Sequence, residues 1–263
     1  MISIIRMIAL LALPLAALGM TSCGGKSENR TQMLTEGFEN IEILTNTSVV
    51  TVLPSSDGEC KLVCNEKKDI THTAEIKDGI LKISVKDERS WFKKLFGANL
   101  SVTLYLPTRE YGSLRITSNT GNVTIDSVQC TALTVKLDTG NVTLQNSDVS
   151  DVAVGTDTGN VKLDRVSCTI LAATTDTGKI TLTDTIAKGK FDLVANTGDI
   201  LFERCDAESF FAKTDTGDVR GSFLTDKIIF ADTKTGKVDT PKLTSGGKCE
   251  ITTTTGDIKI TIE

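Results

Sequence analysis

A Thr-Gly pair recurs at an almost constant interval through the second half of the chain, and this regularity restricts the possible folds more than any other feature. The pair occurs eight times, with glycines 19 or 20 residues apart. These glycines are Gly121, Gly140, Gly159, Gly178, Gly198, Gly217, Gly236 and Gly256. A fixed period of this length is typical of architectures built by stacking copies of one small unit.

Within each repeat, apolar residues alternate with polar ones. Val123 and Ile125 follow the first glycine at alternating positions, and Leu133 and Val135 do the same before the next glycine. A period of two predicts β-strands, each with one inward face. Each repeat therefore contains two short strands, and no helical pattern lies between them.

One repeat of 19 residues cannot bury its apolar face alone, but repeats stacked about 4.8 Å apart form a continuous core. The sequence therefore predicts an all-β, single-stranded β-helix (β-solenoid) with about 19 residues per coil, regular over residues 117–263. A meander or sandwich of hairpins is the alternative, because Thr-Gly-Asn also resembles a turn. The same residue classes at the same place in each repeat favour the solenoid.

Residues 36–116 show a weaker form of the pattern and are expected to form degenerate N-terminal coils and a cap. Asn46–Val52 and Lys77–Ile83 each resemble one coil. An aromatic and basic segment then interrupts the pattern, and it consists of Trp91, Phe92, Lys93, Lys94, Leu95, Phe96 and Gly97. We expect it to cover the apolar end of the stack, or alternatively to contact lipid headgroups or a partner.

The first 22 residues have the layout of a secretory signal peptide. Arg6 precedes the apolar run Met7–Leu18, which is too short to span a membrane. The sequence Met20-Thr21-Ser22-Cys23 resembles the lipobox of bacterial lipoproteins, which implies lipid attachment at Cys23; an ordinary signal peptide is the alternative. Residues 23–35 are polar and predict a flexible tether. We therefore expect a lipid-anchored protein of the cell envelope, at the outer membrane or cell surface.

The residue before each Thr-Gly pair would align in a column along the stack. The column consists of Asn119, Asp138, Asp157, Asp176, Asn196 and Asp215, followed by Lys234 and Thr254. We expect each Asp or Asn to accept a hydrogen bond from the N–H two residues on, in an Asx-turn. Calcium binding is the alternative, although the calcium-binding G-G-x-G-x-D repeat is absent.

The first threonine of each Thr-x-Thr, such as Thr156 or Thr175, shares the parity of the inward residues. We therefore expect it to pack inside the stack and to form hydrogen bonds along it. This parity argues against an external threonine ladder that binds ice or glycans.

Cysteine spacing and composition exclude several kinds of site. Cys130 and Cys168 would lie about 9.6 Å apart, two coils away from each other, which is too far for a disulfide. We expect all six cysteines after Cys23 to be buried free thiols. The only histidine, His72, has no recognisable catalytic or metal-binding partners in the sequence, which predicts no metal, cofactor or catalytic residue. A net charge of −5 without a basic block argues against nucleic acid as a partner.

The Thr-Gly-Asn/Asp-Val repeat, the segment Leu104-Tyr105-Leu106-Pro107 and the lipobox together resemble the bacterial β-strand-repeat "putative adhesin" family. The resemblance covers Phe38 to Ile262 and implies a right-handed solenoid in the cell envelope, without catalytic residues. We expect a non-enzymatic protein that presents a long side to a protein or polysaccharide. An envelope-stress or assembly component that binds envelope proteins or peptidoglycan is the alternative, and a polysaccharide-active enzyme is a weaker one.

Overall fold

The computed structural model of the chain describes residues 28–89 and 100–263. Several residues singled out in the sequence lie outside these ranges, so their predicted roles stay predictions. They are Cys23, Trp91, Phe92, Lys93, Lys94 and Phe96. Among the described residues no helix has the length and apolar character needed to cross a membrane.

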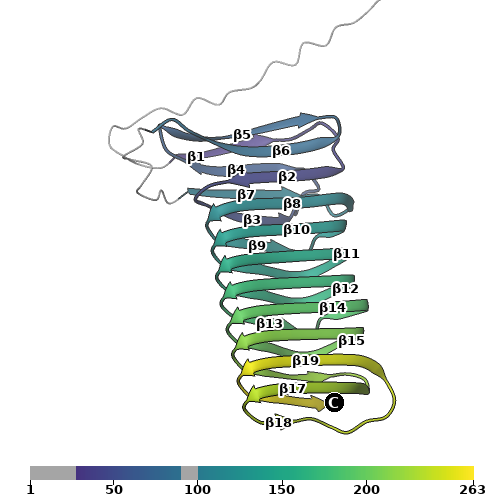
Figure 1. The fold of residues 1–263 in the computed structure, drawn as a ribbon. Coiled ribbons are helices and arrows are strands. Elements are labelled where there is room, and N and C mark those ends of the chain that lie inside the picture. Colours follow the sequence, from purple (N-terminus) through teal and green to yellow (C-terminus); the bar gives the residue numbers. More distant parts are fainter. Residues whose placement is uncertain (1–27, 90–99) are drawn as a thin grey trace, which may run out of the picture.

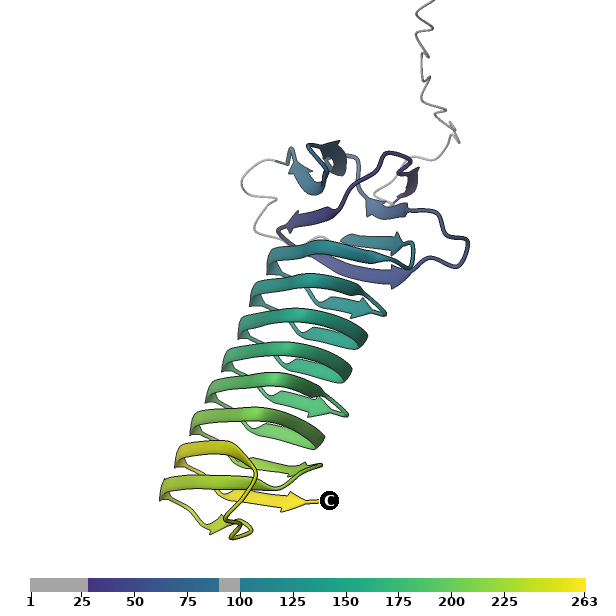
Figure 2. The ribbon, with the colours of Figure 1, turned by 90° about the vertical axis from the view of Figure 1, so that its right-hand side faces the viewer.

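The molecule is a stack of β-coils, in which successive turns of the chain lie one above another (Figures 1 and 2). This confirms the predicted all-β solenoid fold. The strands form two faces of the stack, and the core lies between these two faces. We call them the short-strand face and the long-strand face.

The short-strand face contains the residues that follow each Thr-Gly pair. Its strands, given from the N-terminal end of the stack, are β1 (Glu28–Met33), β4 (Lys61–Glu66), β7 (Leu100–Leu106), β3 (Ser48–Pro54), β9 (Val123–Asp126), the first residues of β11 (Val142–Thr158) and β12 (Val161–Thr177), β13 (Ile180–Thr183), the first residues of β15 (Ile200–Thr216), β16 (Val219–Phe223), β20 (Ile258–Ile262) and β18 (Val238–Asp239).

The long-strand face contains the residues that precede each Thr-Gly pair. In the same direction its strands are β5 (Ile70–Lys77), β6 (Ile80–Asp87), β2 (Asn40–Thr45), β8 (Glu110–Thr120), β10 (Gln129–Thr139), the later parts of β11 and β12, β14 (Ile186–Thr197), the later part of β15, β19 (Gly247–Thr255) and β17 (Lys227–Thr235). Because β11, β12 and β15 continue around the edge, the two faces form one sheet.

Parallel pairing one repeat apart holds the coils in register. Val142 pairs with Val161 and Leu144 with Leu163, each 19 residues further along the chain. Most inward residues are buried and stack on their equivalents, so one apolar core runs from Leu34 to Ile260, with partly buried residues such as Ile229 packed against it. The alternating pattern in the sequence is therefore explained by burial of one side of every strand.

The N-terminal end combines coils with antiparallel strands. The segment Asn46–Val52 continues the stack as predicted, because β3 pairs in parallel with β9. The segment around Asp78-Gly79 was expected to form a coil corner, but it forms a hairpin turn that joins β5 to β6 antiparallel. Both turn residues have positive φ, 52° and 75°, as this kind of tight turn requires. Strand β4 is likewise antiparallel to β7 and to β1.

The last two coils of the solenoid are stacked in the reverse of chain order. Strand β15 pairs with β19 rather than β17, and β17 pairs only with β19. The C-terminal coil, β19–β20, therefore lies between the β15–β16 coil and the β17–β18 coil, as the yellow and green ribbons in Figure 2 show. The column order predicted from the sequence, with Lys234 before Thr254, is reversed in space.

Two glycines at the start of the inserted coil let its backbone pass close to the neighbouring coils. A Cβ built on Gly246 would lie 2.0 Å from the carbonyl oxygen of Asp226, and one on Gly247 would lie 2.5 Å from that of Glu208. Close to these glycines Lys227 is almost completely buried, and its Nζ bonds to Asp206 and Thr225. This buried ion pair links β17 to β15 past the inserted coil.

Candidate functional site

The Thr-Gly pair forms the first corner of each coil, and only glycine fits there. The eight corner glycines have φ between +140° and +154°, a region that other residues rarely adopt. A Cβ on Gly159 would lie 2.0 Å from the carbonyl oxygen of Gly140 in the preceding coil. The most regular residue of the repeat therefore has a structural role.

The inward threonines before the corner also serve the fold. Thr156 and Thr175 are buried, and their hydroxyls donate to the carbonyl oxygens of Gly140 and Gly159 at 3.0 and 2.9 Å. This confirms the packing predicted from their parity. It leaves no outward ladder of these hydroxyls for a ligand.

The predicted Asp/Asn column lies at the surface, but the Asx-turns expected for it are wrong. An Asx-turn at Asp138 needs the backbone N–H of Gly140, and that N–H donates instead to the carbonyl oxygen of Thr158 at 2.9 Å. The same bond to the next coil occupies the N–H at the other corners of the column. The exposed residues concerned are Asn119, Asp138, Asp157, Asp176, Asn196 and Asp215.

The residue after each corner glycine, which sequence reasoning did not single out, forms the true polar ladder. The side-chain oxygen of Asn141 accepts a hydrogen bond from the backbone N–H of Asn160 at 2.8 Å, and Asn122 accepts the N–H of Asn141 at 2.9 Å. Asp199 and Asp218 act in the same way further along the stack. The recurrence of Asn or Asp at this position was the available signal.

A second corner lies six residues after each of the first five glycines. The residue there has a φ of 48° to 57°, yet its type varies. These residues are Ser127, Asn146, Arg165, Asp184 and Arg204. Because four different residue types occupy these five positions, the sequence did not predict this corner.

Side chains at the second corner bind one another from coil to coil. Asn146 Nδ2 donates to Asp126 at 2.8 Å, and Arg165 Nε donates to Asn146 Oδ1 at 2.8 Å. Arg204 makes two bonds to Asp184, at 2.6 and 2.8 Å. A polar groove of about 380 Å³ opens beside these side chains. It is lined by Thr108, Ser127, Gln129, Asn146, Ser147, Asp148, Arg165 and Ser167.

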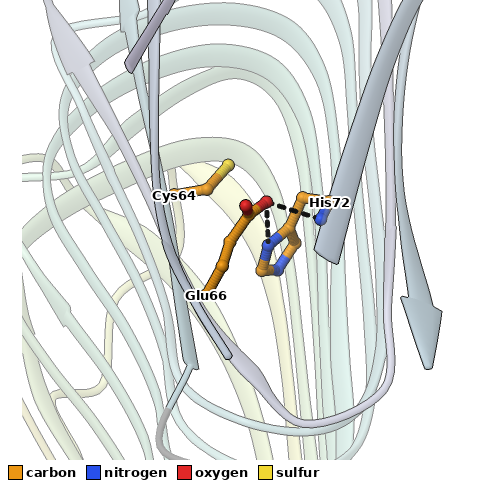
Figure 3. A group of neighbouring side chains, drawn as sticks. All are labelled: Cys64, Glu66 and His72. Carbon is orange, nitrogen blue, oxygen red and sulfur yellow. Dashed lines mark hydrogen bonds and ion pairs between the residues drawn. The ribbon is translucent and has the colours of Figure 1, made fainter. Parts of the chain in front are cut away.

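A different kind of cluster lies inside the N-terminal end of the stack, where Cys64, Glu66 and His72 meet (Figure 3). Cys64 and Glu66 are inward residues of β4, and His72 is an inward residue of β5. One ligand atom from each lies within 4.8 Å of the others. The expectation that His72 has no such company is therefore wrong. The alternating parity of the two strands was the signal that could have found it.

Glu66 is the centre of this cluster. Its Oε1 accepts the backbone N–H of His72 at 2.6 Å, and its two carboxylate oxygens accept hydrogen bonds from Arg30 of β1 at 3.2 Å. Burial alone would raise the pKa of the Glu66 carboxyl, but Arg30 and the N–H of His72 hold that pKa below its usual value. The carboxylate is thus ionised at neutral pH.

His72 faces Glu66 with one ring nitrogen and Ser48 with the other. The distances are 3.4 Å from Nδ1 to Glu66 Oε1 and 3.1 Å from Nε2 to Ser48 Oγ. Burial lowers the pKa of the imidazole, which is therefore neutral at pH 7. The order Ser-His-Glu matches a hydrolytic triad, but the side chain of His72 and the whole of Ser48 are 0% exposed. A substrate therefore has no access to Ser48 Oγ.

The six cysteines are buried free thiols, as expected. Burial raises the pKa of each thiol, to about 11 for Cys60 and Cys205 and to about 12 for the others. Cys130 and Cys168 lie two coils apart, since both pair with Val149.

The chain belongs to the Toastrack DUF4097 family, whose model matches residues 38–261. This match covers nearly all of the solenoid and its N-terminal end. Among curated proteins none is recognisably similar to the chain.

Two solved structures share the fold. One is from Bacteroides fragilis and is described as a "putative adhesin"; it is 19% identical, covers 89% of this chain and 97% of its own, and has a TM-score of 0.51. The other, from Parabacteroides merdae, has the same description, 13% identity, coverage of 90% and 97%, and a TM-score of 0.57. At these identities the likeness extends to the architecture alone.

Proposed function

We propose that the protein is a lipid-anchored, non-enzymatic component of the cell envelope that presents the second-corner side of its solenoid to a partner, in the manner of an adhesin. The polar groove beside Asn146 and Arg165 is the observation that carries this proposal. The description of both structural neighbours as adhesins is consistent with it.

The groove is suited to binding because its polar groups are held in place before a partner arrives. Arg165 is held by Asn146 and Asp164, and Asn146 by Asp126, so little side-chain freedom is lost on association. Hydroxyl, amide, carboxylate and guanidinium groups alternate there, and this mixture matches the hydroxyl groups of a polysaccharide. We therefore propose polysaccharide as the partner.

Anchoring is supported by the sequence alone, through the lipobox and the polar segment that follows it. Lipid on Cys23 would hold the first strand, β1, near a membrane and let the stack extend from it. The tether of residues 23–35 would give the domain freedom to reach a partner.

Protease shaving of intact cells tests the location. We expect an antibody against the solenoid to lose its signal while a periplasmic control protein survives. A Cys23→Ser variant should be released from the membrane fraction. Protection of the solenoid until the envelope is broken would contradict the adhesin role and would direct the search to wall and envelope-protein partners.

Binding by the groove is tested with an array of bacterial and host polysaccharides. We expect Asn146→Ala combined with Arg165→Ala to weaken the wild-type signal at least tenfold. Arg220→Ala is the matched control, because Arg220 is a surface arginine of β16 that bonds to Asp218 and lies outside the groove. Equal loss in the control variant, or no loss in the groove variant, would contradict this assignment.

A further inference from the structure

The Cys64–Glu66–His72 cluster offers three different ligand atoms in one buried place. A thiol sulfur, a carboxylate oxygen and an imidazole nitrogen are the set that zinc and similar transition metals prefer. All three residues are buried, and their ligand atoms point toward one another from β4 and β5 (Figure 3).

His72 Nδ1 is the observation that points to a bound cation. It is buried and has no hydrogen-bond partner, one of two such side-chain atoms in the described part of the chain. In the tautomer with the proton on Nε2, which donates to Ser48 Oγ, Nδ1 presents a lone pair toward Glu66 Oε1. In the other tautomer Nδ1 carries the proton toward Oε1, and a metal ion takes the place of that proton. Lone pairs of a buried nitrogen and a buried carboxylate oxygen that face each other repel unless a proton or a metal ion lies between them.

The separation of these two atoms fits a shared metal ion. Two bonds of about 2.1 Å at the tetrahedral angle place their ligand atoms about 3.4 Å apart. The distance between His72 Nδ1 and Glu66 Oε1 is 3.4 Å. The sulfur of Cys64 lies within 4.8 Å of both, so a small movement of its side chain completes the third bond.

The groups around the cluster would orient these ligands as outer-shell partners do in metal proteins. Ser48 Oγ can accept the Nε2 proton of His72 when Nδ1 binds the metal, and Arg30 bonds to both carboxylate oxygens of Glu66. Arg30 also bonds to the carbonyl oxygen of His72, so β1 closes over the cluster. The side chains of Arg30 and Glu66 are 39% and 11% exposed, which gives an ion a route from solvent.

We propose that Cys64 Sγ, Glu66 Oε1 and His72 Nδ1 bind one divalent transition-metal ion of the zinc type. On binding, the thiol of Cys64 releases its proton to solvent, and the thiolate becomes the ligand. The metal adds a link between β4 and β5, which are also joined by the short turn closed by Lys67 and Ile70 and by the bond from the N–H of His72 to Glu66. It therefore stabilises the N-terminal end of the stack.

Cobalt(II) is the first probe, because a thiolate ligand gives it a characteristic charge-transfer absorption. The full-length chain is purified in detergent, treated with a chelator and titrated with Co²⁺, then with Zn²⁺. We expect one equivalent of Co²⁺ to produce the thiolate band, Zn²⁺ to abolish it, and Zn²⁺ to raise the thermal unfolding midpoint.

Variants assign the ligands. Cys64→Ser should lose the thiolate band, while Glu66→Gln and His72→Gln should weaken binding at least tenfold. Cys60→Ser is the matched control, since Cys60 is also a buried cysteine at the same end of the molecule but lies outside the cluster. Circular dichroism checks that each variant is folded. If Cys64→Ser or His72→Gln does not fold, Glu66→Gln still tests the site, because glutamine keeps the side-chain volume of glutamate.

Either of two results overturns the proposal. The first is a wild-type chain that gives no thiolate band with Co²⁺ and no thermal shift with Zn²⁺. The second is a band that survives in folded Cys64→Ser or that disappears equally in Cys60→Ser. Because these readouts concern metal binding alone, they are independent of the proposed adhesin role.

Discussion

At the scale of single residues, the corner glycines connect the repeat in the sequence to the stacking of the coils. Each one both adopts a φ that other residues avoid and lets the next backbone approach closely. The two constraints act together, so relief of one does not remove the other.

Gly159→Ala should therefore be strongly destabilising. The new Cβ would meet the carbonyl oxygen of Gly140 at 2.0 Å, and a positive φ adds strain. We expect a loss of at least about 2 kcal/mol in the free energy of unfolding, measured by chemical denaturation. Gly37→Ala is the control, because a Cβ there meets nothing within 4 Å and φ is not positive. A Gly159→Ala variant as stable as this control would contradict the close approach at the corner.

The buried thiols give a second test at this scale. Because burial raises their pKa values to about 11 or 12, few thiolates exist at pH 8, and the thiols are also shielded from reagents. We expect Cys60, Cys64, Cys130, Cys168, Cys205 and Cys249 to react with a thiol reagent only after denaturation, when all six become accessible. Rapid labelling of any of these six cysteines in the native protein would show that the core is not packed as described.

At the scale of one coil, two neighbouring columns contain similar residues but have different roles. Asn141 accepts a backbone N–H from the next coil, whereas Asp138 is exposed beside the corner. Similar side chains three residues apart therefore contribute unequally to stability.

Asn141→Ala should lower the free energy of unfolding by about 0.5–1.5 kcal/mol, the usual loss for one hydrogen bond. Asp138→Ala should change it by less than about 0.5 kcal/mol. Thermal unfolding of the two variants beside the wild type makes the comparison. A larger loss for Asp138→Ala would mean that the column before the Thr-Gly pair stabilises the corner after all.

Strands, inward residues and first corners could be predicted because each depends on a pattern that repeats within one coil. The second corner could not, since Arg165 and Asp184 adopt similar φ values, 53° and 48°, with unrelated side chains. The Cys64–Glu66–His72 cluster depends on an antiparallel region where the repeat is absent, so spacing alone did not bring its members together. The Asx-turns failed because the N–H of Gly140 has a better acceptor in the next coil.

At the scale of the whole molecule, the reversed order of the last two coils decides which strands are paired on both sides and which form the edge of the sheet. Strands β19 and β20 have a partner on both sides, although they contain the C-terminal residues. Strands β17 and β18 have a partner on one side only and include the exposed Phe230 and Val238.

Hydrogen exchange measured by mass spectrometry should reverse the usual rule that chain ends exchange first. We expect slow exchange in β19–β20 and faster exchange in β17–β18, because amides at an unpaired edge open more readily. Stacking in chain order would give the opposite result, with fast exchange at the C-terminus and protection of β17.

The position of the inserted coil also determines when the stack of coils can be completed during synthesis of the chain. A polypeptide that emerges from its N-terminus can stack its coils one after another as far as β16, but the position next to β15 and β16 belongs to β19 and β20, which are made after β17 and β18. A chain cut short before Gly247 would thus keep an unfilled strand edge that quality-control proteases can attack. Synthesis of residues 247–263 fills this edge, so proteolytic susceptibility of the stack should fall only after that segment is made.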